Sequence, residues 1–500
     1  MNLRTIMRKA NLDYPDAYGD IEISAVVSDS EKIQSNCVFV CISGSRVDGH
    51  SYIKKALDAG AAAVVVEYGR GAIYRSERVI ETKSTRRALS YLLDAFYSHP
   101  SKTMRLVGVT GTNGKTSVTN ILKSIFETAG YKCGIIGTLG SFIGTEQVKV
   151  FSGNSLANMT TPDPKELYLI LDVMRKSGVQ YVFIEASSHA LYYEKLAPLW
   201  FECSVFTNLT PEHLDFHGSM DEYLASKQKL FAQSRLGIIN YDSPYARAIE
   251  DCCDRSVTCS ASSQNTDYFA KDITLSLGES TEYILCGNEA FFKVSSLLAG
   301  EFNVMNTLQA AAAALELGVD AESIRCAIGS FGGVCGRMER VIFDGDKDCA
   351  VFIDYAHTPD ALENVLLTLK NLKKNTSRLT VLFGCGGDRD ASKRKEMGRI
   401  AVTLADYAII TSDNCRSEKR AKIFSDILEG VANATNYVLI PDRRDALCFA
   451  ARLAAIGDTV LLAGKGHEKY EIIGDERLPF DEYEIIKEFI EDNCERKQHK

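Results

Sequence analysis

The chain has 500 residues, too many for one ordinary hydrophobic core, and this length predicts two to four domains. Hydrophobic residues make up 45% of the chain and charged residues 25%, which is typical of a soluble globular protein. The formal net charge of -9 at pH 7 disfavours a general nucleic-acid or membrane-surface binder, because the phosphates of such a partner would be poorly neutralised. An anionic small molecule can still bind at a local basic site.

The 15 cysteines are scattered and form no C-x-x-C pair, a pattern that favours reduced thiols over a disulfide framework. The N-terminal stretch 1–20 lacks the apolar core of a signal peptide. Apolar stretches such as 61–66 are far too short to span a bilayer. We therefore expect a cytoplasmic protein.

A small α/β unit is predicted over residues 1–101. Its segments CVFVCISG (37–44) and HSYIKKALDAGAAAVVVE (50–67) indicate a strand, an amphipathic helix and a second strand. A second unit, predicted over 102–337, opens with a short apolar strand at 106–109, a Gly-rich turn and a helix that ends at Gly130.

Three more apolar runs follow in the second unit: VQYVFIEASS (179–188), CSVFTNLT (203–210) and LGIINYD (236–242). The alternation of helix and strand signals predicts an α/β fold with mainly parallel sheets. The third unit, predicted over 338–500, holds four apolar runs that each end in a polar turn: AVFIDYAH (350–357), LTVLFGCGGDRD (379–390), YAIITSDNCR (407–416) and TVLLAGKGH (459–467). Ligands bind at the carboxyl ends of strands in open α/β sheets, so these four endings are expected to line one rim.

The strongest local signal is TGTNGKT (110–116). Its glycines let backbone N–H groups approach a phosphate, the following helix presents its positive end, and Lys115 supplies a charge. Thr116 has the hydroxyl that a Mg²⁺ ion would use. The loop departs from the strict G-x-x-x-x-G-K-[ST] pattern, since Val109 replaces its first glycine. The residues predicted to bind the nucleotide here are Gly111, Thr112, Asn113, Gly114, Lys115, Thr116 and Ser117.

This phosphate loop resembles that of the Mur ligases and of the related folylpolyglutamate synthetases. Further segments look like Mur ligase motifs, and they occur in family order: EASSHAL (185–191), NLTPEHLDFHGSMDEYLASK (208–227), GEFNVMN (300–306), GRMER (336–340), DYAHTPDAL (354–362), GCGGDRD (384–390) and GKGHE (464–468). The resemblance implies three domains: an N-terminal UDP-binding domain, a central P-loop ATPase domain and a C-terminal Rossmann-like domain.

The resemblance also implies an ATP-dependent ligase that phosphorylates a carboxylate and lets an amine attack the acyl phosphate. Such chemistry needs cations near several anions, because phosphoryl transfer depends on positioning and charge neutralisation. Segment 28–53 is similar to the uridine-binding segment of family members that add the third amino acid to UDP-N-acetylmuramoyl-L-alanyl-D-glutamate, with Ser30 at the family's Ser position. The implied substrates are therefore ATP, this UDP-linked dipeptide and a diamino acid.

By the same resemblance, Thr116, Glu185 and His213 are predicted Mg²⁺ ligands. Lys227 lies in an amphipathic helical stretch, where a lysine is normally a solvated surface residue. The matching family position carries a carbamylated lysine, an anion that could hold a second Mg²⁺ or orient the substrate carboxylate. We therefore expect Lys115, Glu185, His213 and Lys227 to be the catalytic residues.

The other site residues are also assigned by resemblance. Those expected to contact the nucleotide are Asn306, Arg337, Asp354 and His357. Those expected to bind the UDP-sugar peptide are Ser30, Thr160, Thr161, Ser187, Tyr193 and Lys195. Two of these depart from the family pattern, because Tyr193 stands where a Gln is expected and Lys195 where an Arg is expected. Lys keeps the charge but loses the bidentate fork.

The amino-acid site is expected at Arg389, Asp413, Asn414, Cys415, Arg416, Gly464 and Glu468. Diaminopimelate-adding members have a D-N-P-R motif, whereas lysine-adding members typically lack its Arg. Here Arg416 is retained and suits a second carboxylate, while Glu468 suits a distal ammonium, so the motif favours meso-2,6-diaminopimelate. Cys415 replaces the Pro, which would have fixed φ and made the loop rigid.

Three alternatives stay open at this point. The ligase could use L-lysine or L-ornithine instead of diaminopimelate. A folylpolyglutamate synthetase is disfavoured by the N-terminal segment and by the D-N-C-R motif (413–416). A catalytically inactive nucleotide-binding switch would be expected to lose Lys115, Glu185, His213 or Lys227, and all four are present.

Overall fold

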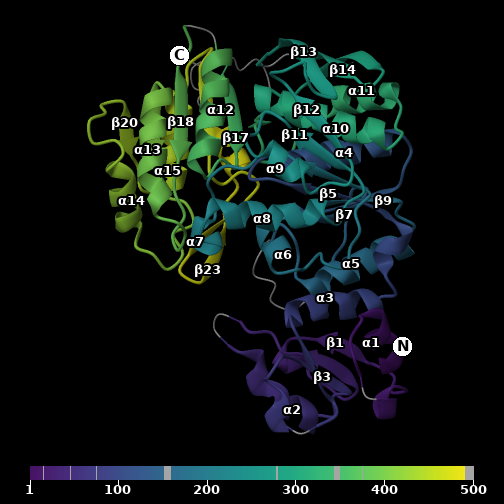
Figure 1. Ribbon diagram of the computed structural model, residues 1–500. Helices are drawn as coiled ribbons and strands as arrows, with labels where there is room; N and C mark the ends of the chain where they lie inside the picture. The colour runs from purple at the N-terminus through teal and green to yellow at the C-terminus, as the bar shows by residue number, and fades with distance from the viewer. Residues whose placement is uncertain are drawn as a thin grey trace.

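The computed structural model contains three large sheets that follow one another along the chain (Figure 1). It describes residues 1–14, 16–44, 47–74, 76–150, 159–277, 280–342, 349–373 and 376–489. The end of the predicted third domain, 490–500, and residues 45–46 of the predicted uridine-binding segment lie outside these ranges. The N-terminal sheet lies at one end of the molecule, and the other two lie side by side.

The N-terminal sheet has four parallel strands in the order β1–β2–β3–β4. Their bounds are Ala25–Val27, Cys37–Val40, Ala63–Glu67 and Val79–Thr82. The predicted strand, helix and second strand are confirmed as β2, α2 (Ile53–Asp58) and β3. α3 (Thr85–Phe96) then leads toward the second sheet and packs against α5 (Pro164–Lys176), so the first two units share one apolar cluster.

The central sheet has 11 strands in the order β15–β14–β13–β12–β11–β10–β5–β9–β6–β7–β8. Its middle is parallel, and the predicted apolar runs are confirmed as β5 (Arg105–Thr110), β9 (Tyr181–Glu185), β10 (Cys203–Phe206) and β11 (Gly237–Asn240). The remaining strands are β6 (Cys133–Gly137), β7 (Gly140–Ile143), β8 (Glu146–Gln147), β12 (Ser256–Ser260), β13 (Tyr268–Thr274), β14 (Thr281–Gly287) and β15 (Ala290–Ser296).

Antiparallel pairs form both edges of the central sheet, and the sequence patterns did not indicate them. The helices around this sheet are α4 (Lys115–Thr128), α6 (Ser188–Tyr192), α7 (Leu214–His217), α8 (Met220–Phe231), α9 (Ala246–Glu250), α10 (Glu301–Glu316) and α11 (Ala321–Ser330). α4 packs against α10 and α11, and its buried Ile121, Leu122 and Ile125 join their apolar residues in one cluster.

The third sheet has the order β16–β17–β21–β18–β19–β20, with β16 antiparallel and the rest parallel. The bounds are Glu339–Arg340, Ala350–Asp354, Thr459–Ala463, Leu379–Phe383, Tyr407–Ile410 and Tyr437–Leu439 in that order. Four neighbouring strands, β17, β21, β18 and β19, are the four predicted apolar runs. Their polar endings therefore lie along one rim, as expected.

Helices α12 (Pro359–Leu372), α13 (Ser392–Leu404), α14 (Arg420–Leu428) and α15 (Arg443–Leu453) surround this third sheet (Figure 1). A short hairpin, β22 (Tyr470–Ile473) with β23 (Glu476–Pro479), follows β21. Within the ranges described, no helix is both long and apolar enough to cross a membrane. We keep the boundaries 1–101, 102–337 and 338–500 as proposed domain limits, since each range contains one large sheet.

Candidate active site

The phosphate loop connects β5 to α4, and its two glycines permit close approaches that a side chain would block. A Cβ atom on Gly111 would lie 1.9 Å from Oγ1 of Thr207. Gly114 has a φ of 87°, and a Cβ there would lie 2.7 Å from Oδ1 of Asn306. Asn306, on α10, is thus next to the loop, as expected for a nucleotide contact. Ser117 follows Thr116 in the first turn of α4.

Two lysine side chains meet at one carbonyl oxygen of this loop. Lys115 Nζ donates to Gly111 O at 2.9 Å and to Thr112 O at 2.7 Å. Lys227 Nζ, from α8, donates to the same Gly111 O at 2.9 Å. Lys227 is only 1% exposed, so the solvated surface position normal for such a lysine is not what the structure shows. Burial and then the charge of Lys115 lower the pKa of Lys227 well below its usual value.

The Glu185 carboxylate, at the end of β9, is 1% exposed and is surrounded by hydroxyl groups. Thr116 Oγ1 donates to its Oε2 at 2.9 Å, and Thr138 donates from both its backbone N–H and its hydroxyl at 3.0 Å. Among the described residues, no three His, Cys, Asp or Glu side chains gather as a metal site. Mg²⁺ usually binds through one or two carboxylates plus substrate phosphates, and the adjacent oxygens of Thr116 and Glu185 fit that donor set.

His213 lies beside a carboxylate that the sequence analysis did not select. Its Nε2 is 3.7 Å from Oε1 of Glu212, and His357 Nε2, from the third sheet, is 3.6 Å from the same oxygen. Burial alone would raise the pKa of Glu212, but its hydrogen bond to His357 and the charges of His213 and Lys115 hold the pKa below its usual range. Burial lowers the pKa of His213, which favours the neutral imidazole that binds metal.

The other predicted nucleotide residues lie where the second and third units meet. The Arg337 guanidinium stacks 4.7 Å from the ring centroid of Tyr355, and Asp354 Oδ2 accepts from the Met338 backbone at 2.7 Å. A direct contact joins the phosphate loop to α12 of the third unit, because Asn113 Nδ2 donates to Oδ2 of Asp360 at 2.8 Å. Thr210 Oγ1 contacts the same oxygen at 3.3 Å.

The predicted sugar-peptide residues form a chain that begins at the Glu185 network. Thr138 Oγ1 lies 3.1 Å from Oγ1 of Thr160, within hydrogen-bond distance. Thr161 Oγ1 donates to the Glu185 carbonyl at 2.6 Å and lies 3.1 Å from Oγ of Ser187. These threonines and Ser187 are therefore adjacent to the predicted metal ligands.

The other three residues predicted to bind the sugar peptide have different surroundings from Thr160, Thr161 and Ser187. They are Lys195, Tyr193 and Ser30. Lys195 is buried, and its Nζ donates to Oδ1 of Asp163 at 2.8 Å. Tyr193 faces the N-terminal unit, where the Arg86 guanidinium lies 4.3 Å from its ring centroid. Ser30 belongs to the N-terminal unit and its carbonyl accepts from Lys55. Lys195 Nζ also donates to the Thr161 carbonyl at 3.5 Å, so Lys195 touches the hydrogen-bonded network around Glu185, whereas the contacts of Tyr193 and Ser30 lie outside that network.

The predicted amino-acid site forms on the rim of the third sheet. Asp413 and Asn414 follow β19, Gly464 follows β21, and Asn414 Nδ2 donates to Oε2 of Glu468 at 2.7 Å. The fully buried Lys465, which the sequence analysis quoted but did not select, lies 3.4 Å from Asp413 and donates to Oδ1 of Asn414 at 3.2 Å.

The loop that carries Cys415 and Arg416 is held by hairpin β22–β23. Arg416 N donates to the Ile472 carbonyl at 3.1 Å, and Gly474 N donates to the Arg416 carbonyl at 2.8 Å. Cys415 is buried against the same strand, with Sγ 3.8 Å from Ile472 O. These bonds supply the order that the missing proline would have given. Arg389, on the neighbouring turn after β18, is exposed.

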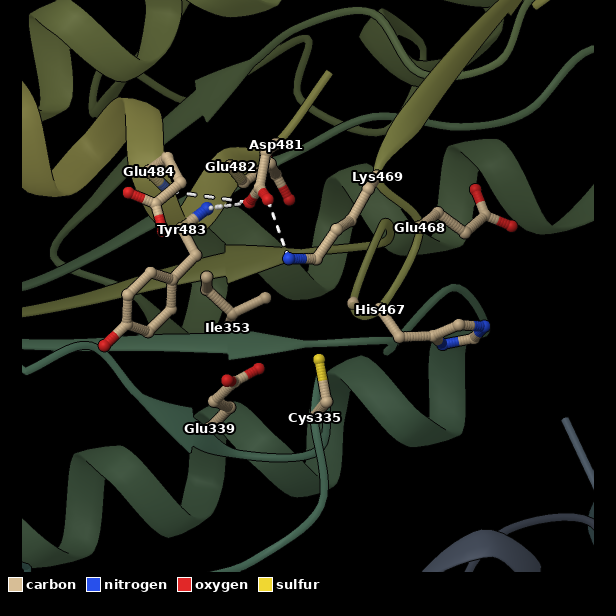
Figure 2. Close-up of a pocket in the computed structure, with 11 residues that line it drawn as sticks. Cys335, Glu339, Ile353, His467, Glu468, Lys469, Asp481, Glu482, Tyr483 and Glu484 are labelled. Carbon is tan, nitrogen blue, oxygen red and sulfur yellow. Dashed lines mark hydrogen bonds and ion pairs between the residues drawn. The ribbon is translucent and has the colours of Figure 1, made fainter. Parts of the chain in front are cut away.

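A cavity of about 210 Å³ lies beside the GKGHE loop (Figure 2). Cys335, Glu339 and Lys469 line it, and Lys469 pairs with Asp481 at 2.9 Å. Glu468 is one of the residues that line this cavity, and in Figure 2 its carboxylate points away from the other lining residues. Its Oε2 accepts from Asn414 Nδ2. The cavity thus adjoins the predicted amino-acid site, and Glu468 belongs to both.

The sequence analysis missed several polar residues of the site, which are Thr138, Glu212, Asp360, Arg443 and Lys465. Glu212, Asp360 and Lys465 lie inside motifs that were recognised, so their position next to selected residues was an available signal. Thr138 and Arg443 lie outside every recognised motif, and their contacts with the site depend on tertiary folding.

Comparisons with known proteins agree with this geometry. Three family models match in order: the Mur ligase family catalytic domain at 22–97, the Mur ligase middle domain at 109–314, and the Mur ligase glutamate ligase domain at 336–466. A protein from Syntrophomonas wolfei, named UDP-N-acetylmuramoyl-L-alanyl-D-glutamate–2,6-diaminopimelate ligase, is 38% identical over 98% of this chain and 99% of its own length. A protein of the same name from Bacillus cereus is 39% identical over 94% of both chains.

A solved structure of a ligase of that name aligns with a TM-score of 0.70 and 29% identity, over 99% of this chain and 100% of its own. The chain belongs to the Mur ligase family, whose members are ATP-dependent acid–amino-acid ligases. Within the family it is of the MurE type.

Proposed function

We propose that this chain joins meso-2,6-diaminopimelate to UDP-N-acetylmuramoyl-L-alanyl-D-glutamate as the third amino acid of the peptide, in peptidoglycan synthesis. The similarity to ligases with these substrates, over nearly the whole chain, supports the reaction. ATP and UDP-linked precursors are cytoplasmic metabolites, so the proposal places the reaction in the cytoplasm.

In this proposal the substrate carboxylate lies near Thr160, Thr161 and Ser187, facing the phosphate loop. Lys115 leaves the carbonyls of Gly111 and Thr112 and pairs with the phosphates of ATP, where a cation stabilises the charge that develops during transfer. Bound at Thr116 and Glu185, Mg²⁺ would neutralise further phosphate charge. Carbamylated Lys227, an anion, orients the substrate carboxylate or holds a second ion.

The acceptor amino acid enters from the rim of the third sheet, and its amine attacks the acyl phosphate with release of phosphate. Arg416 selects diaminopimelate over other amino acids by pairing with its distal carboxylate. One of its guanidinium nitrogens donates to Gly387 O at 2.8 Å, and this bond aims the group along the rim. Another contact of the same nitrogen is the Asn414 carbonyl at 3.4 Å, and Asn414 Nδ2 donates to Oε2 of Glu468 at 2.7 Å, so an anion-binding and a cation-binding group flank one asparagine. The distal carboxylate and the distal ammonium of a diamino dicarboxylic acid then each find a partner.

Replacing Arg416 by Ala is expected to lower kcat/KM for meso-diaminopimelate about 30- to 1000-fold, since a charge pair in a closed site is worth about 2–4 kcal/mol. The value for lysine should change much less, because lysine has no distal carboxylate. Steady-state kinetics with diaminopimelate, lysine and ornithine on both proteins measures this. Arg420→Ala is the matched control, because Arg420 pairs with Glu471 near the same hairpin.

A wild-type preference for lysine or ornithine would contradict the choice of acceptor and leave the Mur ligase assignment intact. The same holds if Arg416→Ala leaves the preference among the three amino acids unchanged.

A further inference from the structure

Arg443, the first residue of α15, is a fully buried arginine that touches the rim of the third sheet from behind. Its Nη1 donates to the Ser412 carbonyl at 2.9 Å, and its Nη2 donates to the Ala463 carbonyl at 3.0 Å. Its Nε donates to Oε1 of Glu482 at 2.8 Å. All three donor nitrogens of the guanidinium are thus used, each on a different segment of the chain.

The two carbonyls belong to the residues that immediately precede Asp413 and Gly464, both predicted to contact the incoming amino acid. Ala463 is the last residue of β21, and Ser412 follows the end of β19. These two strands are not neighbours in the sheet, because β18 lies between them. Ladder hydrogen bonds therefore cannot set the distance between the two loops directly. Arg443 bridges them across the width of β18 with one planar group.

Arg443 also interacts electrostatically with Asp413, in one of the two loops that it joins. Glu482, 3% exposed at the edge of the cavity in Figure 2, is its counter-ion. Burial alone would raise the pKa of Asp413, but the charges of Lys465 and Arg443 lower it to about 2. The Asp413 carboxylate therefore stays negatively charged at neutral pH, and the rim keeps this charge. A lysine at position 443 would keep the charge but reach only one of the two carbonyls well.

We propose that Arg443 is a positioning residue for the incoming amino acid, holding loops 413–416 and 464–468 at the separation that the acceptor requires. The inference rests on the proposed function of the rim as the acceptor site. Arg443 itself is behind the rim and acts through the backbone of Ser412 and Ala463. It therefore affects how the acceptor binds and leaves the phosphate loop on the central sheet unaffected.

The test compares Arg443→Lys with Arg444→Lys, a matched control at the next position, whose arginine is exposed and pairs loosely with Glu488 at 3.6 Å. We expect Arg443→Lys to raise the KM for the acceptor amino acid about tenfold or more, since small misplacements of binding groups have effects of that size. The KM for ATP should stay within about twofold, and Arg444→Lys should leave both values unchanged. A folded Arg443→Lys protein with a lower Tm and an unchanged acceptor KM would overturn the proposal.

A buried arginine is hard to replace, so a second variant guards against loss of folding. Arg443→Gln combined with Glu482→Gln leaves no unpaired buried charge and can fold where a single change fails. This double variant also removes the guanidinium that donates to both carbonyls, so we expect the same rise in the KM for the acceptor amino acid. An unchanged acceptor KM would reject the positioning role of Arg443. A wild-type protein that joins none of the diamino acids would refute the proposed function instead, which keeps the two failures distinct.

Discussion

Replacing Lys115 by Ala is expected to abolish ATP-dependent ligation while leaving the protein folded. Lys115 makes its two hydrogen bonds to loop carbonyls of Gly111 and Thr112, and it is the cation closest to where phosphates would lie at the start of α4. Removing one preorganised cation or donor from a closed site typically lowers kcat about 10²–10³-fold. The fold should survive, because alanine has a higher helix propensity, and because Glu212, whose carboxylate is near Lys115, keeps His213 and His357 beside it.

Phosphate release from ATP in the presence of the UDP-linked dipeptide and the diamino acid measures this effect. Lys123→Ala is the control, since Lys123 lies on the same helix and pairs with Glu127 at 2.8 Å, away from the loop. Near-wild-type turnover in a folded Lys115→Ala protein would show that this loop does not bind the phosphates.

The second large effect is expected at Lys227. Two ammonium groups cannot comfortably share the carbonyl of Gly111, and burial together with Lys115 lowers the pKa of Lys227. The neutral amine is the form that adds CO₂, giving a carbamate and releasing one proton. A carbamate would exchange the repulsion from Lys115 for attraction, so the burial of this lysine supports the predicted modification.

We expect Lys227→Ala to lose activity by about 10²-fold or more, because an anion that orients the reacting carboxylate would be missing. Acetate or formate should restore part of the rate by occupying the space of the carbamate. Lys229→Ala, an exposed neighbour on α8, should be fully active. Mass spectrometry of the native protein gives a second measure, since the carbamate adds one CO₂ that acid removes. Full activity of Lys227→Ala at saturating Mg²⁺ would contradict the assignment.

Local patterns were sufficient to predict ten of the parallel strands in the three sheets, but not the parallel strands β1, β4, β6, β12 and β20. Short apolar runs that end in Gly-rich or polar turns are unambiguous when they recur, and β5, β9 and β10 follow that rule. The antiparallel strands β13, β14 and β15 were not predicted, because polar and charged residues interrupt their apolar residues and no continuous apolar run marks them. Such strands have no motif, and their pairing depends on the neighbouring strand.

The sequence indicated which residues are candidates for the site, but it did not indicate their burial or the hydrogen bonds between them. The amphipathic pattern around Lys227 suggests a solvent-facing side chain, and only the packing of α8 against the phosphate loop shows that it is buried. Cys415 looked like a source of flexibility, because the hairpin that fixes this loop is more than fifty residues further along the chain. Contacts over such distances are set by tertiary structure, which a single sequence does not display.

Asp360, on α12 of the third unit, accepts hydrogen bonds from Asn113 of the phosphate loop and from Thr210, both in the second unit. Such bonds are exchanged for bonds to water when two surfaces part, so each contributes only about 0.5–1.5 kcal/mol. The apolar clusters within each unit are far costlier to open. Separating the two units at this contact therefore costs less free energy than opening either apolar cluster, and domain motions of that kind typically take microseconds to milliseconds. A nucleotide that contacts both the second and the third unit would slow their separation. Release of ADP is therefore a candidate for the slowest step of the catalytic cycle.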